Sequence, residues 1–374
     1  MRELVRIPAF DVEAFRVGLE KALRGSGPAV LPVTDDSVSL EGYVHDDVAL
    51  VIETSGSSGT PKRVGLSATA LLANARASHG RLGGKGQWLL ALPLNYVAGA
   101  QVLVRSLDAE IEPVTLGAGP FTPEGFVRAA VNMDAPRKYT SLVPAQLARL
   151  VEFAESSGSA AEVLSSFNAI LVGGQATPVT LVRRATALGM SIVTTYGSTE
   201  TAGGCVYDGI ALEGVRVEID DAGQVVIAGD ILATEYVSGA PSHVAFTERD
   251  GVRFYATGDL GRLESGRLII EGRTDRVLIS GGVKVALDAI ESAVVQAAYP
   301  NAVAVAVDDA TWGQRPVLVV EGSADAASED ELRAVIREQL GKVAVPDRIV
   351  WVSELPRLSS GKPDHVAIRA LALA

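Results

Sequence analysis

A run of small and hydroxylated residues near the start of the chain suits the binding of an anion. The stretch TSGSSGTPKRV, residues 54–64, follows directly on the apolar run Val48–Ile52. A Gly/Ser/Thr loop behind a strand presents backbone N–H groups and hydroxyls to a phosphate. The alternative is a flexible Gly/Ser connection that binds nothing.

The loop does not have the spacing of the ordinary P-loop. That motif places a lysine directly after its second glycine, where a helix begins. Here Gly56 and Gly59 are three positions apart, and Thr60 and Pro61 separate Gly59 from Lys62. A P-loop kinase therefore has the wrong loop spacing, and a different phosphate chemistry is favoured.

Three further stretches carry groups that suit a nucleotide, and each has a plainer alternative. A strand-like run ends in Gly173 and Gly174, which lets a flat ligand approach the backbone, although a left-handed turn needs the same residues. YGSTET, residues 196–201, offers a ring, hydroxyls and a carboxylate for a base, a phosphate and Mg²⁺, or is only a polar turn. In YATGDLGRL, residues 255–263, Asp259 suits a ribose diol, or belongs to a tight Asx turn.

Two stretches near the C-terminus add charged groups. GRTDRVLISGGVKV, residues 272–285, is either part of a site or a charged linker between domains. Lys362 stands in the loop RLSSGKPDH, residues 357–365, and a lysine this close to a terminus is more often solvated than functional. The single cysteine and four scattered histidines exclude a disulfide framework and a multi-cysteine zinc site.

Composition bounds the class of protein. A length of 374 residues predicts two or three domains, and the net charge of −12 argues against a nucleic-acid surface. The first residues are too poor in apolar side chains for a signal peptide. No apolar stretch approaches the roughly 18 residues that a membrane span needs. A cytoplasmic protein is expected, with no membrane and no nucleic acid among its partners.

The elements that position these groups follow from periodicity. Residues 10–23 have apolar side chains at helical spacing. From there to about residue 235, strand and helix patterns alternate, which predicts α/β layers with a largely parallel sheet. Residues 215–271 give brief strands broken by glycine turns, as in a small antiparallel barrel or sheet.

A small α+β domain is predicted beyond residue 276. Its pattern is a helix, two strands, a second helix and a last strand. The second helix is expected to start at Ser328, with Glu331 at capping-box spacing, and to end near Gly341. The predicted domains are therefore residues 1–271 and 277–374, with the boundary segment at 272–276, which the resemblance named below makes a hinge.

Read in order, these stretches resemble the adenylate-forming superfamily of acyl-CoA ligases, carrier-loading adenylation domains and luciferases. The resemblance extends from Val48 to Lys362. It implies a large N-terminal domain of α/β layers plus a small distorted β-barrel, followed by a small mobile α+β C-terminal domain. It also implies a reaction in which a carboxylate attacks the α-phosphate of ATP and pyrophosphate leaves.

The resemblance further implies how ATP is held. The residues that would cradle its β- and γ-phosphates are Thr54, Ser55, Gly56, Ser57, Ser58, Gly59, Thr60 and Lys62. Gly173, Gly174 and Gln175 would line the adenine edge, and Tyr196 would stack on its face.

Charged groups would act at the α-phosphate and the ribose. By the same resemblance, Thr199 touches the α-phosphate and Glu200 binds Mg²⁺. Asp259 and Arg273 hold the ribose hydroxyls. Lys362 is the catalytic cation, which a compact ammonium on a flexible stem suits.

A second half-reaction is implied with coenzyme A as cosubstrate. In the family, the small domain turns about a hinge residue that corresponds here to Asp275. The loop at Gly281 and Gly282 would then line a pantetheine channel, because small residues let the thiol arm pass.

The resemblance places the acid-binding motif of the family at LPLNYVAGAQVLVR, residues 92–105. This stretch lacks the aspartate that amino-acid-activating relatives usually carry, and its one cation is Arg105. An arginine in an apolar pocket suits a second carboxylate on the substrate, and the alternative is a surface arginine at a helix end. Tyr96, where a histidine is common, and Gly197 are also assigned to the acid.

Three details resemble one subgroup, the o-succinylbenzoate–CoA ligases of menaquinone biosynthesis. They are the position of Arg105, the stretch YTSLVPAQLARL at 139–150, and the short stretch before the Gly/Ser loop. The alternatives left open are another aryl or fatty acid–CoA ligase, a stand-alone enzyme that loads a carrier protein, and a nucleotide-binding protein without turnover. The expected partners are the acid, ATP and CoA, with a homodimer left open.

Overall fold

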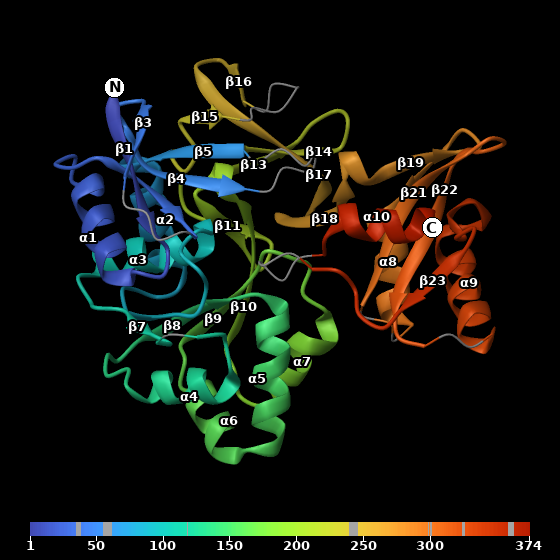
Figure 1. Cartoon of the computed structure of the whole chain (residues 1–374), viewed down its shortest axis with the longest axis horizontal. Helices are drawn as coiled ribbons and strands as arrows, with labels where there is room; N and C mark the ends of the chain where they lie inside the picture. Colours follow the sequence, from blue (N-terminus) through green and yellow to red (C-terminus); the bar gives the residue numbers. More distant parts are fainter. Residues whose placement is uncertain are drawn as a thin grey trace. The chain divides into compact units, whose positions relative to one another are not determined.

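The computed structural model describes most of the chain (Figure 1). The described residues are 1–34, 39–54, 62–117, 119–238, 246–297, 299, 301–323, 326–357 and 363–374. The chain divides into two compact units. Unit 1 comprises Met1–Glu218, Val226–Ala256 and Ser265–Leu268, and unit 2 comprises Ile219–Val225, Thr257–Glu264 and Ile269–Ala374.

Unit 1 contains a mixed six-stranded sheet. Its strands, in spatial order, are β15 (Glu235–Ser238), β5 (Lys62–Ser67), β4 (Val48–Thr54), β2 (Ala29–Val33), β1 (Arg2–Pro8) and β3 (Ser39–Val44). β4 and β5 are antiparallel and pair Thr54 with Lys62. The Gly/Ser loop therefore joins two adjacent antiparallel strands, whereas a P-loop leads from a strand into a helix.

A seven-stranded sheet forms the second layer of unit 1. Its spatial order is β12 (Ile210–Ala211), β11 (Gly203–Tyr207), β10 (Ile192–Ser198), β9 (Ala169–Val172), β8 (Lys138–Leu142), β6 (Gln87–Leu90) and β7 (Val114–Thr115). The strands from β10 to β7 pair in parallel, as the alternating sequence pattern predicts. Parallel strands bring their carboxyl ends to one edge of a sheet, where α/β proteins bind ligands.

Helices cover both faces of the second sheet. One face packs with the first sheet and with α1 (Val12–Leu23), α2 (Ala68–Arg81) and α3 (Val97–Ala109). Figure 1 shows the other helices together beyond the opposite face: α4 (Pro123–Val131), α5 (Pro144–Ser156), α6 (Gly158–Ser165) and α7 (Val179–Ala187). Within β9, Leu171 packs in the first core and Ile170 in the second, so both faces of the strand are buried.

A third sheet of antiparallel strands follows in the sequence. Its members are β13 (Arg216–Ile219), β14 (Gln224–Ala228), β17 (Val252–Glu264) and β16 (Phe246–Arg249), with β18 (Arg267–Arg273) paired to β17. The division between units falls within these strands. β17 runs through Gly258 and Asp259, so the alternative of a tight Asx turn at Asp259 is not what the structure shows.

Unit 2 contains a five-stranded sheet covered on both faces. Its strands are β20 (Val283–Ala286), β19 (Val277–Ser280), β22 (Gly313–Glu321) and β21 (Ala302–Asp309), with β23 (Ile349–Val352) paired to β22. Helices α8 (Leu287–Gln296) and α9 (Ala326–Leu340) pack on one face and α10 (His365–Leu373) on the other. Three short 3₁₀ turns complete the described elements: η1 (Thr199–Thr201), η2 (Thr274–Arg276) and η3 (Lys342–Ala344).

The fold class agrees with the sequence prediction, and two boundaries differ. Helix α9 begins at Ala326, so Ser328 lies inside its first turn and does not cap it. Alanine is the strongest helix former, which explains the earlier start. β6 ends at Leu90, although the apolar run continues to Leu94. Within the described ranges, no helix is both long enough and apolar enough to cross a membrane.

Candidate active site

The carboxyl edge of the parallel sheet gathers two of the predicted nucleotide stretches. Residues 173–175 follow β9, and residues 196–201 end β10 and form η1. The two strands are neighbours, with Thr194 opposite Val172. The structure thus brings Gly173, Gly174, Gln175, Tyr196, Thr199 and Glu200 to one edge of unit 1.

The glycines of this edge are required for different reasons. A Cβ at Gly173 would lie 2.2 Å from Thr195 Oγ1, so this glycine permits close packing of β9 against β10. Gly174 has room for a Cβ but adopts φ +81°, the left-handed region that favours glycine. A Cβ at Gly197 would lie 2.1 Å from the carbonyl oxygen of Gly203 on β11.

Glu200 is a buried carboxylate with one cation beside it. Its side chain is 6% exposed, and Oε1 lies 3.2 Å from Lys62 Nζ. The hydroxyl of Tyr236 on β15 donates to the same oxygen at 3.0 Å. Burial, and next the negative charge of Glu200, raise the pKa of Tyr236, so its hydroxyl stays a donor at neutral pH. One carboxylate oxygen is therefore fixed by two donors.

Part of the predicted site lies outside the described residues. These positions are Ser55, Gly56, Ser57, Ser58, Gly59, Thr60 and Lys362. The two ends of the loop are described, and they pair as Thr54 and Lys62 on adjacent strands. The loop thus begins and ends beside the ion pair between Lys62 and Glu200.

Arg105 is buried in the interior of unit 1. Its side chain is 3% exposed, so the alternative of a surface arginine is wrong. The guanidinium lies over the ring of Trp88 at 4.8 Å, and Nη2 donates to Asn74 Oδ1 at 3.4 Å and to the hydroxyl of Tyr207 at 3.2 Å. All three partners are neutral. In the described part of the chain, Arg105 makes no ion pair with a carboxylate.

Asp108, three residues after Arg105 on α3, pairs with other side chains. Asp108 Oδ2 accepts from Nδ1 of His79 at 3.1 Å and pairs with Lys85 at 3.5 Å. Trp88 donates through Nε1 to Nε2 of His79 at 3.3 Å, which places the ring proton on Nδ1. Burial lowers the pKa of His79, so the ring is neutral at neutral pH.

Asn74 joins the surroundings of Arg105 to the end of the nucleotide stretch. Its Oδ1 accepts from Arg105, while Nδ2 donates to the carbonyls of Gly204 at 2.8 Å and Thr201 at 3.3 Å. The side chain is fully buried. Thr201 is the last residue of η1, directly after Glu200. One amide therefore links the candidate acid-binding arginine to the turn that carries the candidate metal ligand.

Four buried polar atoms around these groups have no hydrogen-bond partner within the described residues. They are Thr54 Oγ1, Ser198 Oγ, Gln101 Oε1 and Arg105 Nε. Native proteins pair nearly all buried polar atoms, so unpaired atoms among candidate site residues are positions where a ligand would supply the missing partner. Thr54 pairs with Lys62 across β4 and β5, and Ser198 is the residue before η1, which contains Glu200. Gln101 precedes Arg105 by one turn of α3 and lies on the same helix face.

The start of α3 is built by close backbone contact. Tyr96 is the residue before the helix, and its carbonyl accepts from the N–H groups of Gly99 and Ala100 at 3.0 Å each. A Cβ at Gly99 would lie 2.1 Å from the carbonyl oxygen of Pro93. Glycine is therefore needed for α3 to begin directly after this turn.

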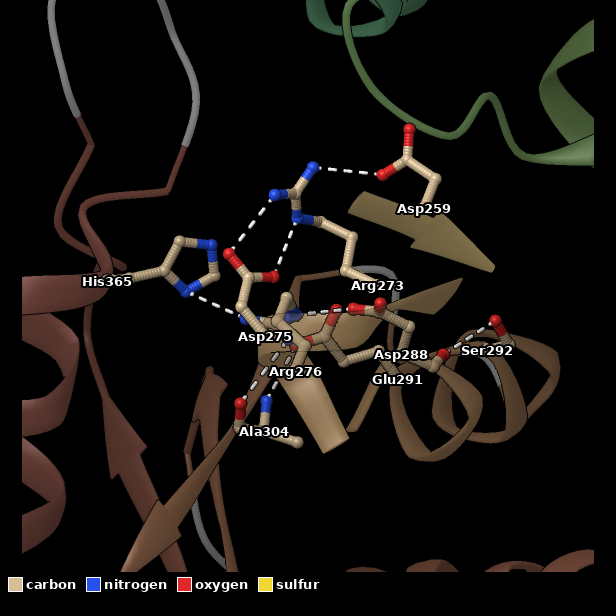
Figure 2. Close-up of polar contacts among 9 residues, drawn as sticks. All are labelled: Asp259, Arg273, Asp275, Arg276, Asp288, Glu291, Ser292, Ala304 and His365. Atoms are coloured by element: carbon tan, nitrogen blue, oxygen red, sulfur yellow. Dashed lines mark hydrogen bonds and ion pairs between the residues drawn. The ribbon is translucent and has the colours of Figure 1, made fainter. Parts of the chain in front are cut away.

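Unit 2 brings the predicted ribose residues together. Arg273 Nη1 donates to Asp259 Oδ1 at 2.9 Å. Its Nε and Nη2 donate to the two carboxylate oxygens of Asp275 at 2.8 and 3.1 Å (Figure 2). The fork of the arginine matches the carboxylate in a bidentate pair. Asp259 and Asp275, from β17 and η2, are thus joined through one guanidinium.

Gly281 and Gly282 form the two-residue turn between β19 and β20. Their φ angles are +56° and +81°, as a type I′ hairpin turn requires. A Cβ at Gly281 would lie 2.6 Å from the ring of Trp312. Conformation and packing both demand glycine here.

The donor set suits magnesium held together with a phosphate ligand. No cluster of three or more His, Cys, Asp or Glu side chains occurs among the residues that the structure describes. Magnesium commonly takes one or two carboxylates plus substrate phosphates. Glu200 supplies such a carboxylate, and Lys62, Thr54 and Ser198 supply donors for phosphate oxygens beside it.

Sequence inspection missed several residues of this site. Tyr236 reaches Glu200 from β15, and its sequence context is an ordinary strand. Asn74 and Tyr207 lie in α2 and β11, with no motif around them. Gln101 had a usable signal, since its spacing of four from Arg105 places both on one helix face.

Comparison with known families supports this geometry. The sequence model described as "AMP-binding enzyme" matches residues 19–236, and that described as "AMP-binding enzyme C-terminal domain" matches residues 289–362. The probable 2-succinylbenzoate–CoA ligase of Mycobacterium tuberculosis is 38% identical over 385 residues, covering 98% of this chain and 97% of that protein.

Solved structures share the fold. The o-succinylbenzoate CoA synthetase (MenE) of Bacillus subtilis in complex with the acyl-adenylate intermediate OSB-AMP has a TM-score of 0.73 at 23% identity. That match covers 95% of this chain and 81% of the solved one. The same enzyme in complex with ATP and a magnesium ion has a TM-score of 0.72 at 23% identity, covering 95% and 82%.

Proposed function

The chain belongs to the AMP-binding enzyme family, and we propose that it joins 2-succinylbenzoate to coenzyme A with ATP as the activating cosubstrate. A carboxylate oxygen of the acid attacks the α-phosphorus, and pyrophosphate leaves with the P–O bond electrons. The CoA thiol then attacks the acyl carbon, AMP leaves, and the thiol proton passes to solvent. The product is 2-succinylbenzoyl-CoA, which the subgroup resemblance assigns to menaquinone biosynthesis.

Unit 1 supplies the groups for the triphosphate. Bringing two anions together requires positioning and neutralisation of charge. We assign Lys62 and the loop at 55–60 to the β- and γ-phosphates, Thr199 to the α-phosphate and Glu200 to Mg²⁺. Bound magnesium neutralises charge on the phosphate oxygens. The ion pair of Lys62 with Glu200 and the unpaired Thr54 and Ser198 oxygens support this assignment.

The choice of acid rests on Arg105. Among the residues that the structure describes, this buried guanidinium has only neutral partners and an unpaired Nε, so it lacks the counter-charge that buried cations normally have. A second carboxylate on the substrate supplies that charge and fits the fork of the arginine. 2-Succinylbenzoate has two carboxylates, so one can be held here while the other reacts.

The remaining assignments concern the two half-reactions. We assign Gly173, Gly174, Gln175 and Tyr196 to adenine, Asp259 and Arg273 to ribose, and Tyr96 and Gly197 to the acid. Lys362 is assigned as the cation at the α-phosphate during adenylation. Asp275 is assigned as the hinge, and Gly281 with Gly282 as the wall of the pantetheine path. The domain limits 1–271 and 277–374, cytoplasmic location and a homodimer stay predictions.

Replacing Arg105 tests the assignment of the acid. Arg105→Leu removes two hydrogen bonds to a carboxylate, so kcat/KM for 2-succinylbenzoate should fall about a hundredfold, or roughly 3 kcal/mol. The KM for ATP should not change. Arg105→Lys keeps the positive charge but not the two parallel donors of the guanidinium. Its kcat/KM for 2-succinylbenzoate should lie between that of the parent enzyme and that of Arg105→Leu. If Arg105→Leu uses 2-succinylbenzoate as well as the parent enzyme does, the acid is bound elsewhere.

A further inference from the structure

Arg276 follows the proposed hinge residue Asp275 and is bonded to two neighbouring elements of unit 2. Its Nε donates to Asp288 and its Nη2 to Glu291, both on α8. Nη2 also donates to the carbonyl of Ala304 on β21 at 3.4 Å. Glu291 Oε1 accepts in addition from Ala304 N–H at 2.8 Å. The arginine therefore fixes η2 to α8 and β21 (Figure 2).

The remaining terminal nitrogen of Arg276 reaches a third element. Its Nη1 lies 3.0 Å from Nδ1 of His365. Arginine nitrogens only donate, so Nδ1 accepts and the imidazole is neutral with its proton on Nε2. His365 is the first residue of α10, which Asp364 caps by accepting from the next backbone N–H groups. Ile368 then anchors the helix in the core.

The contacts change abruptly between two consecutive residues. Asp275 is held by Arg273 at the end of β18, whereas Arg276 is held by α8, β21 and α10. The side chain of Arg276 is 15% exposed and that of Asp275 is 40% exposed. A rotation about Asp275 would therefore leave the bonds of Arg276 intact and move α10 with it.

We propose that Arg276 and His365 form a clamp that couples the hinge to the start of α10, and that both are positioning residues for Lys362. Lys362 precedes His365 by three residues in the sequence. A fixed start of α10 limits where the preceding chain can place its ammonium. The proposal rests on the proposed function, specifically on the use of Lys362 in forming the acyl-adenylate.

Four acidic groups of the described residues act on the two side chains of the clamp. Asp288 and Glu291 contact Arg276 directly, and Asp275 and Asp364 act on His365 through space. Partial burial, and next the charge of Arg276, lower the pKa of His365 below its ordinary value. The neutral acceptor that the clamp needs is thus the dominant form at neutral pH.

The test separates the two half-reactions in the full chain. Adenylation is measured as acid-dependent ATP–pyrophosphate exchange, and thioester formation is measured from supplied acyl-adenylate and CoA. His365→Leu removes the acceptor and should slow adenylation about tenfold, the scale of one hydrogen bond to a charged group. Thioester formation, which does not use Lys362, should stay within about twofold of the parent rate. His365→Asn keeps an acceptor near Nδ1 and should restore adenylation.

Controls make each outcome decisive. His45→Leu changes an exposed histidine of unit 1 and should alter neither half-reaction. Equal loss of both half-reactions in His365→Leu, together with a lower melting temperature, would mean a purely structural role and overturn the clamp. Unchanged adenylation in His365→Leu would also overturn it.

Two more variants cover the remaining cases. If Lys362→Ala still forms the acyl-adenylate, the role proposed for Lys362 is wrong. If Lys362→Ala loses adenylation while His365→Leu keeps it, the role of Lys362 stands and only the clamp is wrong. Should His365→Leu not fold, Arg276→Lys replaces it. Lysine places its three donors on one nitrogen and cannot reproduce the separate Nε, Nη1 and Nη2 contacts of Arg276, so the same selective loss of adenylation is expected. Normal adenylation by Arg276→Lys would contradict the clamp.

Discussion

Arg105 is the buried charge on which the proposed choice of substrate depends. Its guanidinium is held by the ring of Trp88, the amide oxygen of Asn74 and the hydroxyl of Tyr207. These three groups are neutral, so they position the guanidinium without neutralising its charge. Replacing one of these by an isosteric apolar group should weaken the hold on the acid and leave the nucleotide untouched.

Tyr207→Phe is the cleanest replacement around Arg105. It removes the hydroxyl that accepts from Arg105 at 3.2 Å and contacts Ser78 at 2.9 Å. We expect KM for 2-succinylbenzoate to rise about fivefold, or roughly 1 kcal/mol, with KM for ATP unchanged. Tyr139→Phe is the matched control, since the partners of that hydroxyl in the described part of the chain are the carbonyls of Leu82 and Gly84. An equal rise in both variants would contradict a specific role for Tyr207.

Tyr236 should control the use of magnesium through Glu200. Tyr236→Phe removes the donor at 3.0 Å, which leaves Lys62 as the one described donor to Oε1. We expect the Mg²⁺ concentration for half-maximal adenylation to rise about fivefold and excess Mg²⁺ to restore much of the rate. Tyr43→Phe, at an exposed position, is the control. A Mg²⁺ titration identical to that of the parent enzyme would argue against this role.

At the scale of elements, the sequence predicted most of what periodicity and turn chemistry can encode. The alternating strands and helices of unit 1 follow from local pattern, whereas strands β19 and β20, on either side of the glycine turn at 281–282, were not predicted. The contacts of Asn74 with Gly204 and of Tyr236 with Lys62 do not follow from local pattern, because each joins residues more than a hundred positions apart: Asn74 donates to the Gly204 carbonyl, and the Lys62 ammonium lies over the Tyr236 ring at 5.7 Å. Such pairings depend on strand order, which no local pattern contains.

The sequence indicated that glycine is needed at 173 and 174, but it did not indicate the structural reason at each position. Gly173 suggested an approach of ligand to backbone, and in the structure the space beside its Cα is filled by Thr195. Gly174 instead serves its left-handed conformation. A glycine pair in a sequence indicates a close approach or a positive φ, and only the neighbouring strand decides which.

Helix α8 provides a pH-dependent element of unit 2. Burial raises the pKa of Glu291 from 4.5 to about 7, and Arg276 lowers it in part. The folded state therefore binds more protons than the unfolded state between these values, so the free energy of unfolding should fall as pH rises from about 4.5 to 7. Glu291→Gln cannot titrate and should lose this slope.

Urea unfolding at several pH values tests this slope. In a Trp88→Phe background the remaining tryptophans, Trp312 and Trp351, both lie in unit 2 and report on its unfolding. A free energy that rises with pH over this range, or an equal slope in Glu291→Gln, would show that another group titrates.

At the scale of the whole molecule, the candidate residues are distributed over two units. The residues proposed for the phosphates, the metal and the acid belong to unit 1, and those proposed for the ribose and the hinge belong to unit 2, together with Lys362. This distribution matches a reaction in which the chain first activates an acid and then transfers it to a thiol. The family models cover both parts, at residues 19–236 and 289–362.

The most direct measurement of the central claim is formation of AMP by the full chain with ATP, Mg²⁺, CoA and a panel of carboxylic acids. We predict that 2-succinylbenzoate gives AMP and a CoA thioester in equal amounts, and that benzoate, with one carboxylate, gives far less of both. AMP formation with benzoate or a fatty acid at the rate seen with 2-succinylbenzoate would contradict the account, as would ATP binding without AMP formation from any acid.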